Sequence, residues 1–180
     1  MNQHRLTLST ALSLSRILLL APVTYLLTTD VPVHRWWALG ILLVAIGTDF
    51  FDGMLARRLH QVTDLGKIVD PLADKICVGV MVVVLMVSAD IPVWFGLAVL
   101  GRDALIAGGA LYIQRRKMIV PQSNWPGKIS VGLIAAYLLT AVVRVTSLTH
   151  VSAVLLWASV VMMAVSLVSY GGRLFIGPKV

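Results

Sequence analysis

The stretch that decides the fold covers residues 151–175 and reads VSAVLLWASVVMMAVSLVSYGGRLF, with Arg173 as its single charged residue. About 20 apolar residues of helix cross a hydrocarbon core about 30 Å thick, so this segment is long enough to span a membrane. The whole chain agrees with it, because 58% of its 180 residues are hydrophobic and 13% are charged. Soluble domains average about 45–50% apolar and about 25% charged residues. The sequence therefore predicts an all-α integral membrane protein.

Five further segments have the same apolar character, and short polar separators rich in Asp, Pro, Ser and Asn divide them. The six expected transmembrane helices cover roughly residues 12–28, 36–55, 68–87, 92–113, 129–147 and 151–175. No separator is long enough to divide two domains, so a single membrane domain over residues 1–180 is expected. The first segment leads into further apolar sequence without a clear cleavage site, which favours a retained span over a removed signal.

Basic residues indicate the orientation of these spans, because Lys and Arg collect at the cytoplasmic ends of membrane helices. One set of span ends is rich in them, whereas the other has only Arg35 and Arg144. The rich set contains Arg5, Arg16, Arg57, Arg58, Lys67, Arg115, Arg116, Lys117, Lys128, Arg173 and Lys179. Six spans with both termini cytoplasmic satisfy this pattern. Topology then accounts for the net charge of +7, and no nucleic-acid partner is expected.

The acidic residues are distributed unevenly, and all eight of them are Asp. Asp30 and Asp90 fall in the two outer loops and are interpreted as ordinary loop residues, while Asp103 lies inside the fourth span. The other five cluster around the first inner loop: Asp49, Asp52, Asp64, Asp70 and Asp74. An acid at the centre of a membrane helix costs about 2.5–3.5 kcal/mol on insertion scales. Several in one place therefore indicate a compensating positive charge.

Helical geometry groups these acids into two stripes. At 100° per residue, Asp49, Asp52, Gly53, Ala56 and Arg57 fall within an arc of about 140°. On the following helix, Gly66, Asp70 and Asp74 recur at intervals of four residues and form a second stripe. Because only eight residues separate Arg57 from Gly66, the stripes are expected to face each other at the inner membrane surface. Four carboxylates would then converge, which is repulsive without cations.

Carboxylate oxygens are the ligands that Mg²⁺ or Mn²⁺ prefers, and four carboxylates can hold two such ions about 3.5–4 Å apart. A pair of metal ions of this kind serves phosphoryl transfer. Small side chains at Gly53, Ala56 and Gly66 leave room for a nucleotide and its diphosphate, and Arg57 supplies a guanidinium for a phosphate. One cysteine excludes an intrachain disulfide, and the four histidines lack metal-ligand spacing.

The stretch from Asp49 to Asp74 resembles the signature of the CDP-alcohol phosphotransferase family, DxxDGxxARx8GxxxDxxxD, at all eight fixed positions. The six-span architecture extends the resemblance over nearly the whole chain. The segments Leu6-Thr7-Leu8 and Ser15-Arg16-Ile17-Leu18 look most like the phosphatidylglycerophosphate synthase branch of the family.

The resemblance implies an enzyme of phospholipid biosynthesis in the inner membrane of a bacterial-type cell, with its active site facing the cytoplasm. Such an enzyme uses Mg²⁺ or Mn²⁺ to move a phosphatidyl group from CDP-diacylglycerol to a small alcohol, and it releases CMP. It further implies a homodimer. The implied metal ligands are Asp49, Asp52, Asp70 and Asp74, with Asp74 also the general base. The implied CDP-binding residues are Asp52, Gly53, Ala56, Arg57 and Gly66.

The expected acceptor is sn-glycerol 3-phosphate, with Arg102 and Lys128 as candidates for binding its phosphate. A structural partnership between Arg102 and a motif carboxylate is an equally good interpretation of that buried charge. The residues after Lys128 are Ile129-Ser130-Val131, where the branch has a segment rich in Lys and Thr, so inositol phosphate, inositol and serine stay open as acceptors.

Two hypotheses from other classes also stay open. A divalent-cation transporter would use the acids as a permeation site, but it gives no reason for the positions of Gly53, Ala56, Arg57 and Gly66. A noncatalytic membrane protein would pair the acids with Arg57, Arg58, Lys67 and Lys75, and it would bind no nucleotide.

Overall fold

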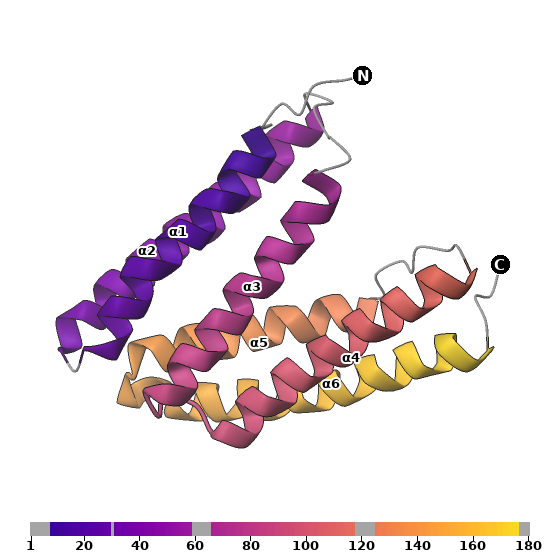
Figure 1. The fold of residues 1–180 in the computed structure, drawn as a ribbon. Helices are drawn as coiled ribbons and strands as arrows, with labels where there is room; N and C mark the ends of the chain where they lie inside the picture. Colours follow the sequence, from indigo (N-terminus) through magenta and orange to yellow (C-terminus); the bar gives the residue numbers. More distant parts are fainter. Residues whose placement is uncertain (1–7, 30, 59–65, 118–124, 177–180) are drawn as a thin grey trace. The chain divides into compact units, whose positions relative to one another are not determined.

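The computed structural model describes residues 8–29, 31–58, 66–117 and 125–176, with side chains for residues 17–29, 31–48, 75–109 and 125–172. The described secondary structure is helical, without strands (Figure 1). Its elements are α1 (Leu8–Thr28), α2 (Pro32–Arg58), α3 (Gly66–Val87), α4 (Val93–Lys117), α5 (Trp125–Val143), the short 3₁₀ helix η1 (Thr146–Leu148) and α6 (Thr149–Ile176). The all-α prediction is therefore confirmed for these residues.

Each expected span corresponds to one α-helix with bounds that differ by four residues or fewer, and the fifth is the one that was expected to end later than its helix does. That span was expected to continue to residue 147, but α5 ends at Val143. Arg144 has a φ of 50°, and Ala89, just after α3, has a φ of 54°. A residue in this left-handed region cannot continue a right-handed helix, so it ends the helix that precedes it. Hydrophobicity alone could not predict this stop.

Prolines mark several helix starts. Pro32 is the first residue of α2, and Pro126 is the second residue of α5. In the first turn of a helix the missing N–H of proline costs nothing, because that turn has no acceptor for it. Before α4, the carbonyl of Pro92 accepts hydrogen bonds from the backbone N–H groups of Phe95 and Gly96 at 3.0 and 3.2 Å.

Two helices of the described chain are long and apolar enough to cross a membrane. They are Trp125–Val143 and Thr146–Gly172, and only 33% and 17% of their apolar windows are buried inside the protein. Large exposed side chains such as Val154, Val161 and Val168 line α6. Exposing such a large apolar surface to water would be unfavourable, so this surface is suited to contact the hydrocarbon core of a membrane.

The chain divides into two compact units, residues 1–88 and 89–180. In the first unit, α1 packs against both α2 and α3. Val23 and Leu27 of α1 and Val82 and Leu85 of α3 are almost completely buried. At the end of this packing, the Ser88 hydroxyl donates to the carbonyl of Leu27 at 3.4 Å. This unit carries the whole Asp49–Asp74 motif.

In the second unit, α6 packs against both α4 and α5. The rings of Phe95 on α4 and Tyr137 on α5 meet edge to face, with centroids 4.8 Å apart. Val99 and Val142 complete the apolar core, and each is about 1% exposed or less. Two serines of α6, Ser159 and Ser166, are fully buried as well. The unit therefore has an apolar interior with a few enclosed polar groups.

Candidate functional site

The first half of the acidic motif lies on the last turns of α2. The helix continues without a break to Arg58, so Asp49, Asp52, Gly53, Ala56 and Arg57 belong to one regular helix. The predicted stripe of about 140° therefore has the helical backbone that it requires.

The second half of the motif begins α3. Gly66 is the first residue of that helix, and Asp70 and Asp74 follow one and two turns later. The side chains of residues 49–74 lie outside those that the structure describes. The convergence of the four carboxylates, and the roles of Gly53, Ala56, Arg57 and Gly66 in binding CDP, stay predictions.

Pro71 follows Asp70 inside α3, as the sixth residue of the helix. A proline at this point of the sequence can stand in the first turn of a helix or kink its interior. Because α3 begins at Gly66, Pro71 lies in the interior of the helix. Since proline has no N–H, the carbonyl of Lys67 loses its usual helical donor within the second half of the motif.

Arg102 is enclosed in the second unit, where its side chain is 5% exposed. Its Nη1 donates to Oδ1 of Asp103 at 2.7 Å, and its Nη2 donates to the hydroxyl of Ser166 at 3.1 Å. Its Nε is buried and finds no hydrogen-bond acceptor among the described residues. Buried polar groups are nearly always hydrogen-bonded, so one donor of this guanidinium is left to be satisfied.

Lys128 stands on the first turn of α5 and is exposed. Its Nζ lies 5.7 Å from the centre of the Trp125 ring, in a cation–π contact. Such a contact at an exposed site is worth about 0.5–1 kcal/mol. Arg102 and Lys128 thus differ in kind, because Arg102 is a fixed buried cation and Lys128 is a solvated one.

Among the side chains that the structure describes, no three His, Cys, Asp or Glu residues form a group that could hold a metal ion. The four motif aspartates are outside that set. By chemistry they fit Mg²⁺ or Mn²⁺, because all four donors are hard carboxylate oxygens.

One sequence interpretation was wrong. Asp90 is not an ordinary loop residue, because its side chain is completely buried and forms an ion pair with Nε of Arg144. Asp90 and Arg144 are far apart in the sequence, so no sequence pattern predicts that they form a pair. The other outer acid, Asp30, lies outside the described residues.

The model of the CDP-alcohol phosphatidyltransferase family matches residues 6–165 of the chain. The chain belongs to this family. The match includes the whole acidic motif, Arg102 and Lys128.

Individual proteins of known name are similar to part of this chain. A CDP-diacylglycerol--glycerol-3-phosphate 3-phosphatidyltransferase of Rickettsia bellii is 32% identical over 113 residues, which are 63% of this chain and 62% of the relative. A protein of Mycobacterium tuberculosis named "Probable phosphatidylglycerophosphate synthase" is 33% identical over 129 residues, 72% of this chain and 60% of its own. A CMP-forming cardiolipin synthase of Streptomyces coelicolor is 34% identical over 97 residues, 54% and 45% respectively. The chain thus matches about 60% or less of the length of these relatives.

Proposed function

We propose that the chain is a phosphatidyltransferase of phospholipid biosynthesis that uses CDP-diacylglycerol as donor and sn-glycerol 3-phosphate as acceptor. The observation that carries the proposal is the complete eight-position motif at the adjoining ends of α2 and α3. The family match and the printed names of the relatives from Rickettsia bellii and Mycobacterium tuberculosis support this donor and this acceptor.

The reaction forms one oxygen–phosphorus bond and breaks another. Asp74 takes the proton from the acceptor hydroxyl while that oxygen attacks the β-phosphorus of the donor, and CMP leaves with the oxygen of the broken bond. Arg57 pairs with a donor phosphate, and the small residues Gly53, Ala56 and Gly66 leave space for the CDP group. Two Mg²⁺ or Mn²⁺ ions held by Asp49, Asp52, Asp70 and Asp74 would supply neutralisation of the diphosphate charge.

The acceptor phosphate is assigned to Arg102, with Lys128 as a second and more exposed cation. The support is the unsatisfied buried Nε of Arg102, which has the charge and geometry to donate to an anion. Asp103 and Ser166 fix the other two nitrogens, so the guanidinium is held in one orientation before the acceptor arrives.

The membrane arrangement is part of the proposal. All six α-helices would cross a bacterial-type inner membrane with both termini cytoplasmic, which places the motif ends of α2 and α3 at the cytoplasmic surface. The two apolar helices α5 and α6 and the distribution of basic residues support it. A homodimer stays a prediction from the family resemblance.

The test is release of CMP from CDP-diacylglycerol by purified protein in detergent, with glycerol 3-phosphate and Mg²⁺. Asp74→Asn removes the proposed general base and is expected to lower kcat by at least about 100-fold, and Asp70→Asn removes a proposed metal ligand and is expected to lower kcat strongly as well. Asp64→Asn is the matched control, because Asp64 belongs to the same acidic cluster but is not one of the motif positions. Full activity of both motif variants, with unchanged circular dichroism, would contradict the proposal.

Metal removal gives an independent check. Chelation with EDTA should abolish CMP release, and added Mg²⁺ or Mn²⁺ should restore it. Metal flux into liposomes with no CMP release would favour the transporter hypothesis. Retained activity after exhaustive chelation would contradict the proposed role of the four carboxylates.

The cardiolipin synthase relative supports a second candidate, in which the same phosphatidyl group passes to a phospholipid acceptor. The two candidates differ in the solubility of the acceptor. A panel of labelled glycerol 3-phosphate, phosphatidylglycerol, inositol phosphate, inositol and serine separates them, and the highest kcat/KM is expected for glycerol 3-phosphate.

A further inference from the structure

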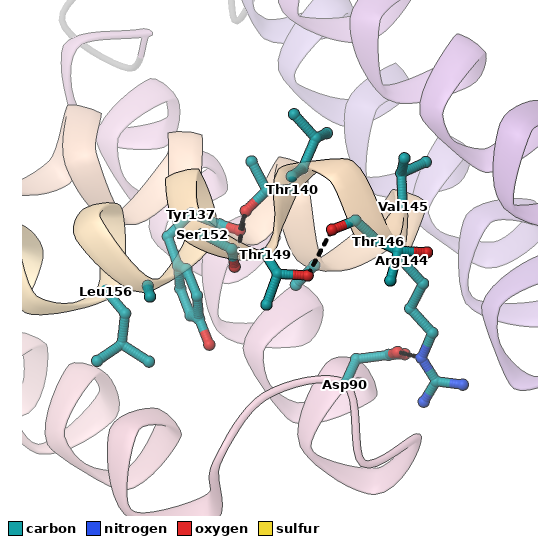
Figure 2. Close-up of a pocket in the computed structure, with 12 residues that line it drawn as sticks. Asp90, Tyr137, Thr140, Arg144, Val145, Thr146, Thr149, Ser152 and Leu156 are labelled. Carbon is teal, nitrogen blue, oxygen red and sulfur yellow. Dashed lines mark hydrogen bonds and ion pairs between the residues drawn. The ribbon is translucent and has the colours of Figure 1, made fainter.

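A hollow of about 460 Å³ lies in the second unit, where α5 ends and α6 begins. Figure 2 shows its lining, which includes Asp90, Tyr137, Thr140, Arg144 and Ser152. None of the residues that line the hollow belongs to the acidic motif.

The polar side of this hollow presents a cation to its opening. The Asp90 carboxylate is completely buried beneath its ion pair with Arg144, whereas the Arg144 side chain is 47% exposed. Hydroxyl groups stand beside it: Thr140 donates to Ser152 at 3.3 Å, and Thr149 donates to the carbonyl of Thr146 at 2.7 Å (Figure 2). The exposed guanidinium is suited to bind a phosphate, whereas the hydroxyl protons of Thr140 and Thr149 are already donated within the protein.

An apolar groove adjoins the polar hollow at Ala153, which lines both. The groove has a volume of about 590 Å³, and the described residues that line it are apolar and all lie on α6: Ala153, Val154, Trp157, Ala158, Val161 and Met162. Met162 lies nine positions after Ala153 on α6, which is about 14 Å of helix axis. Half of a hydrocarbon core about 30 Å thick is about 15 Å, so the groove has the length of one leaflet.

Trp157 forms one wall of the groove and is 63% exposed. Its ring lies beside that of Trp94 on α4, with centroids 6.1 Å apart. Exposed tryptophans of membrane proteins concentrate near the boundary between headgroups and acyl chains. Along α6, a phosphate-binding end is therefore followed by an apolar groove of one leaflet's depth, with an aromatic ring about one turn inside the groove, and this is the order of a lipid headgroup and its acyl chain.

We propose that the polar hollow and the apolar groove together bind one glycerophospholipid, with its phosphate at Arg144 and an acyl chain along α6. The inference goes beyond the proposed reaction, and it rests on the membrane-spanning role of α6. In the proposed six-span topology, the end of α5 and the start of α6 lie on the outer side of the membrane, so the expected ligand is a lipid of the outer leaflet and not the substrate of the cytoplasmic motif.

Native mass spectrometry of the full chain, released from detergent with added dioleoyl phosphatidylglycerol, tests the proposal. Ala153→Leu fills the junction of hollow and groove and should raise the Kd of the lipid adduct at least tenfold. Ala98→Leu makes the same change at an exposed position of α4 and should leave that Kd unchanged. Equal lipid binding by the wild type and Ala153→Leu would overturn the assignment.

The phosphate is tested by a second comparison. Dioleoylglycerol, which has the same chains without a phosphate, should bind at least tenfold more weakly to the wild type. The double variant Asp90→Asn with Arg144→Gln keeps a neutral hydrogen-bonding pair and should abolish that preference. Equal binding of both lipids by the wild type would overturn the role of Arg144, and thermal unfolding of each variant verifies its fold.

Two further arms separate this site from the proposed reaction. Asp74→Asn should lose CMP release and retain the phosphatidylglycerol adduct, whereas Ala153→Leu should retain CMP release and lose the adduct. Loss of the adduct in Asp74→Asn would place the lipid at the catalytic motif and overturn the proposal. Glycerol 3-phosphate alone should not displace the lipid, because the groove contributes to its binding, and displacement would indicate a site for free phosphate.

Discussion

At the scale of single residues, Arg102 shows what burial does to a functional cation. Two of its nitrogens are held by Asp103 and Ser166, and the third is enclosed without an acceptor among the residues that the structure describes. A guanidinium in this state is fixed in direction and still able to donate. The sequence showed that the buried charge of Arg102 inside α4 requires a compensating partner. Its partner Ser166 could not be recognised from the sequence, because it lies 64 positions away on α6.

Ser166→Ala should weaken acceptor binding without impairing the chemical step. A hydrogen bond to a charged group is worth about 1.5–3 kcal/mol, so the KM for glycerol 3-phosphate should rise about tenfold or more. Both kcat and the KM for CDP-diacylglycerol should change little. Steady-state kinetics with each substrate varied in turn measures the difference.

Two neighbouring substitutions make this prediction specific. Ser159 is another buried serine of α6, but it donates only to the Leu156 carbonyl of its own helix, so Ser159→Ala should leave the acceptor KM unchanged. Ser166→Thr keeps the hydroxyl and should retain most of the affinity. If Ser166→Ala lowers kcat equally whichever substrate is varied, Ser166 has a purely structural role.

Ala89 is another residue whose conformation predicts a measurable effect. Its φ of 54° disfavours a side chain, at a cost of about 1–2 kcal/mol. Ala89→Gly should therefore raise the midpoint of thermal unfolding in detergent. Ala98→Gly, inside α4, should lower the midpoint, since glycine costs about 1 kcal/mol within a helix.

At the scale of helices, hydrophobic length predicted where each span lies, because nearly every apolar run of sufficient length became one α-helix. The motif spacing likewise predicted one stripe on α2 and one on α3. The end of α5 could not be predicted, because it depends on the left-handed backbone of Arg144. The burial of Asp90 could not be predicted either, because its partner lies beyond two further helices.

The rings of Phe95 on α4 and Tyr137 on α5 meet edge to face inside the second unit. Phe95 is completely buried, and truncation of a buried phenylalanine to alanine typically costs about 3–5 kcal/mol. Phe95→Ala should markedly lower the midpoint of thermal unfolding. Leu97, two residues further on, is 59% exposed, so Leu97→Ala should change the midpoint much less, and equal losses would contradict the assigned packing.

At the scale of the whole molecule, the proposed six-span topology makes a test of sidedness possible. The chain has one cysteine, Cys77, which is first replaced by serine. A new cysteine at Ser147 should then react with an impermeant maleimide added outside intact cells. A cysteine at Gln122 should react only after the membrane is opened, and the reverse pattern would contradict the orientation.

The buried ion pair of Asp90 and Arg144 also constrains how the second unit is made. Asp90 precedes α4, and Arg144 follows α5, so two complete helices are synthesised before the partner of Asp90 emerges. In the six-span topology, both charges must be translocated across the bilayer before they can meet. The pair therefore closes only on a helical hairpin that has been inserted in full, and an incomplete chain leaves a carboxylate without its counter-ion.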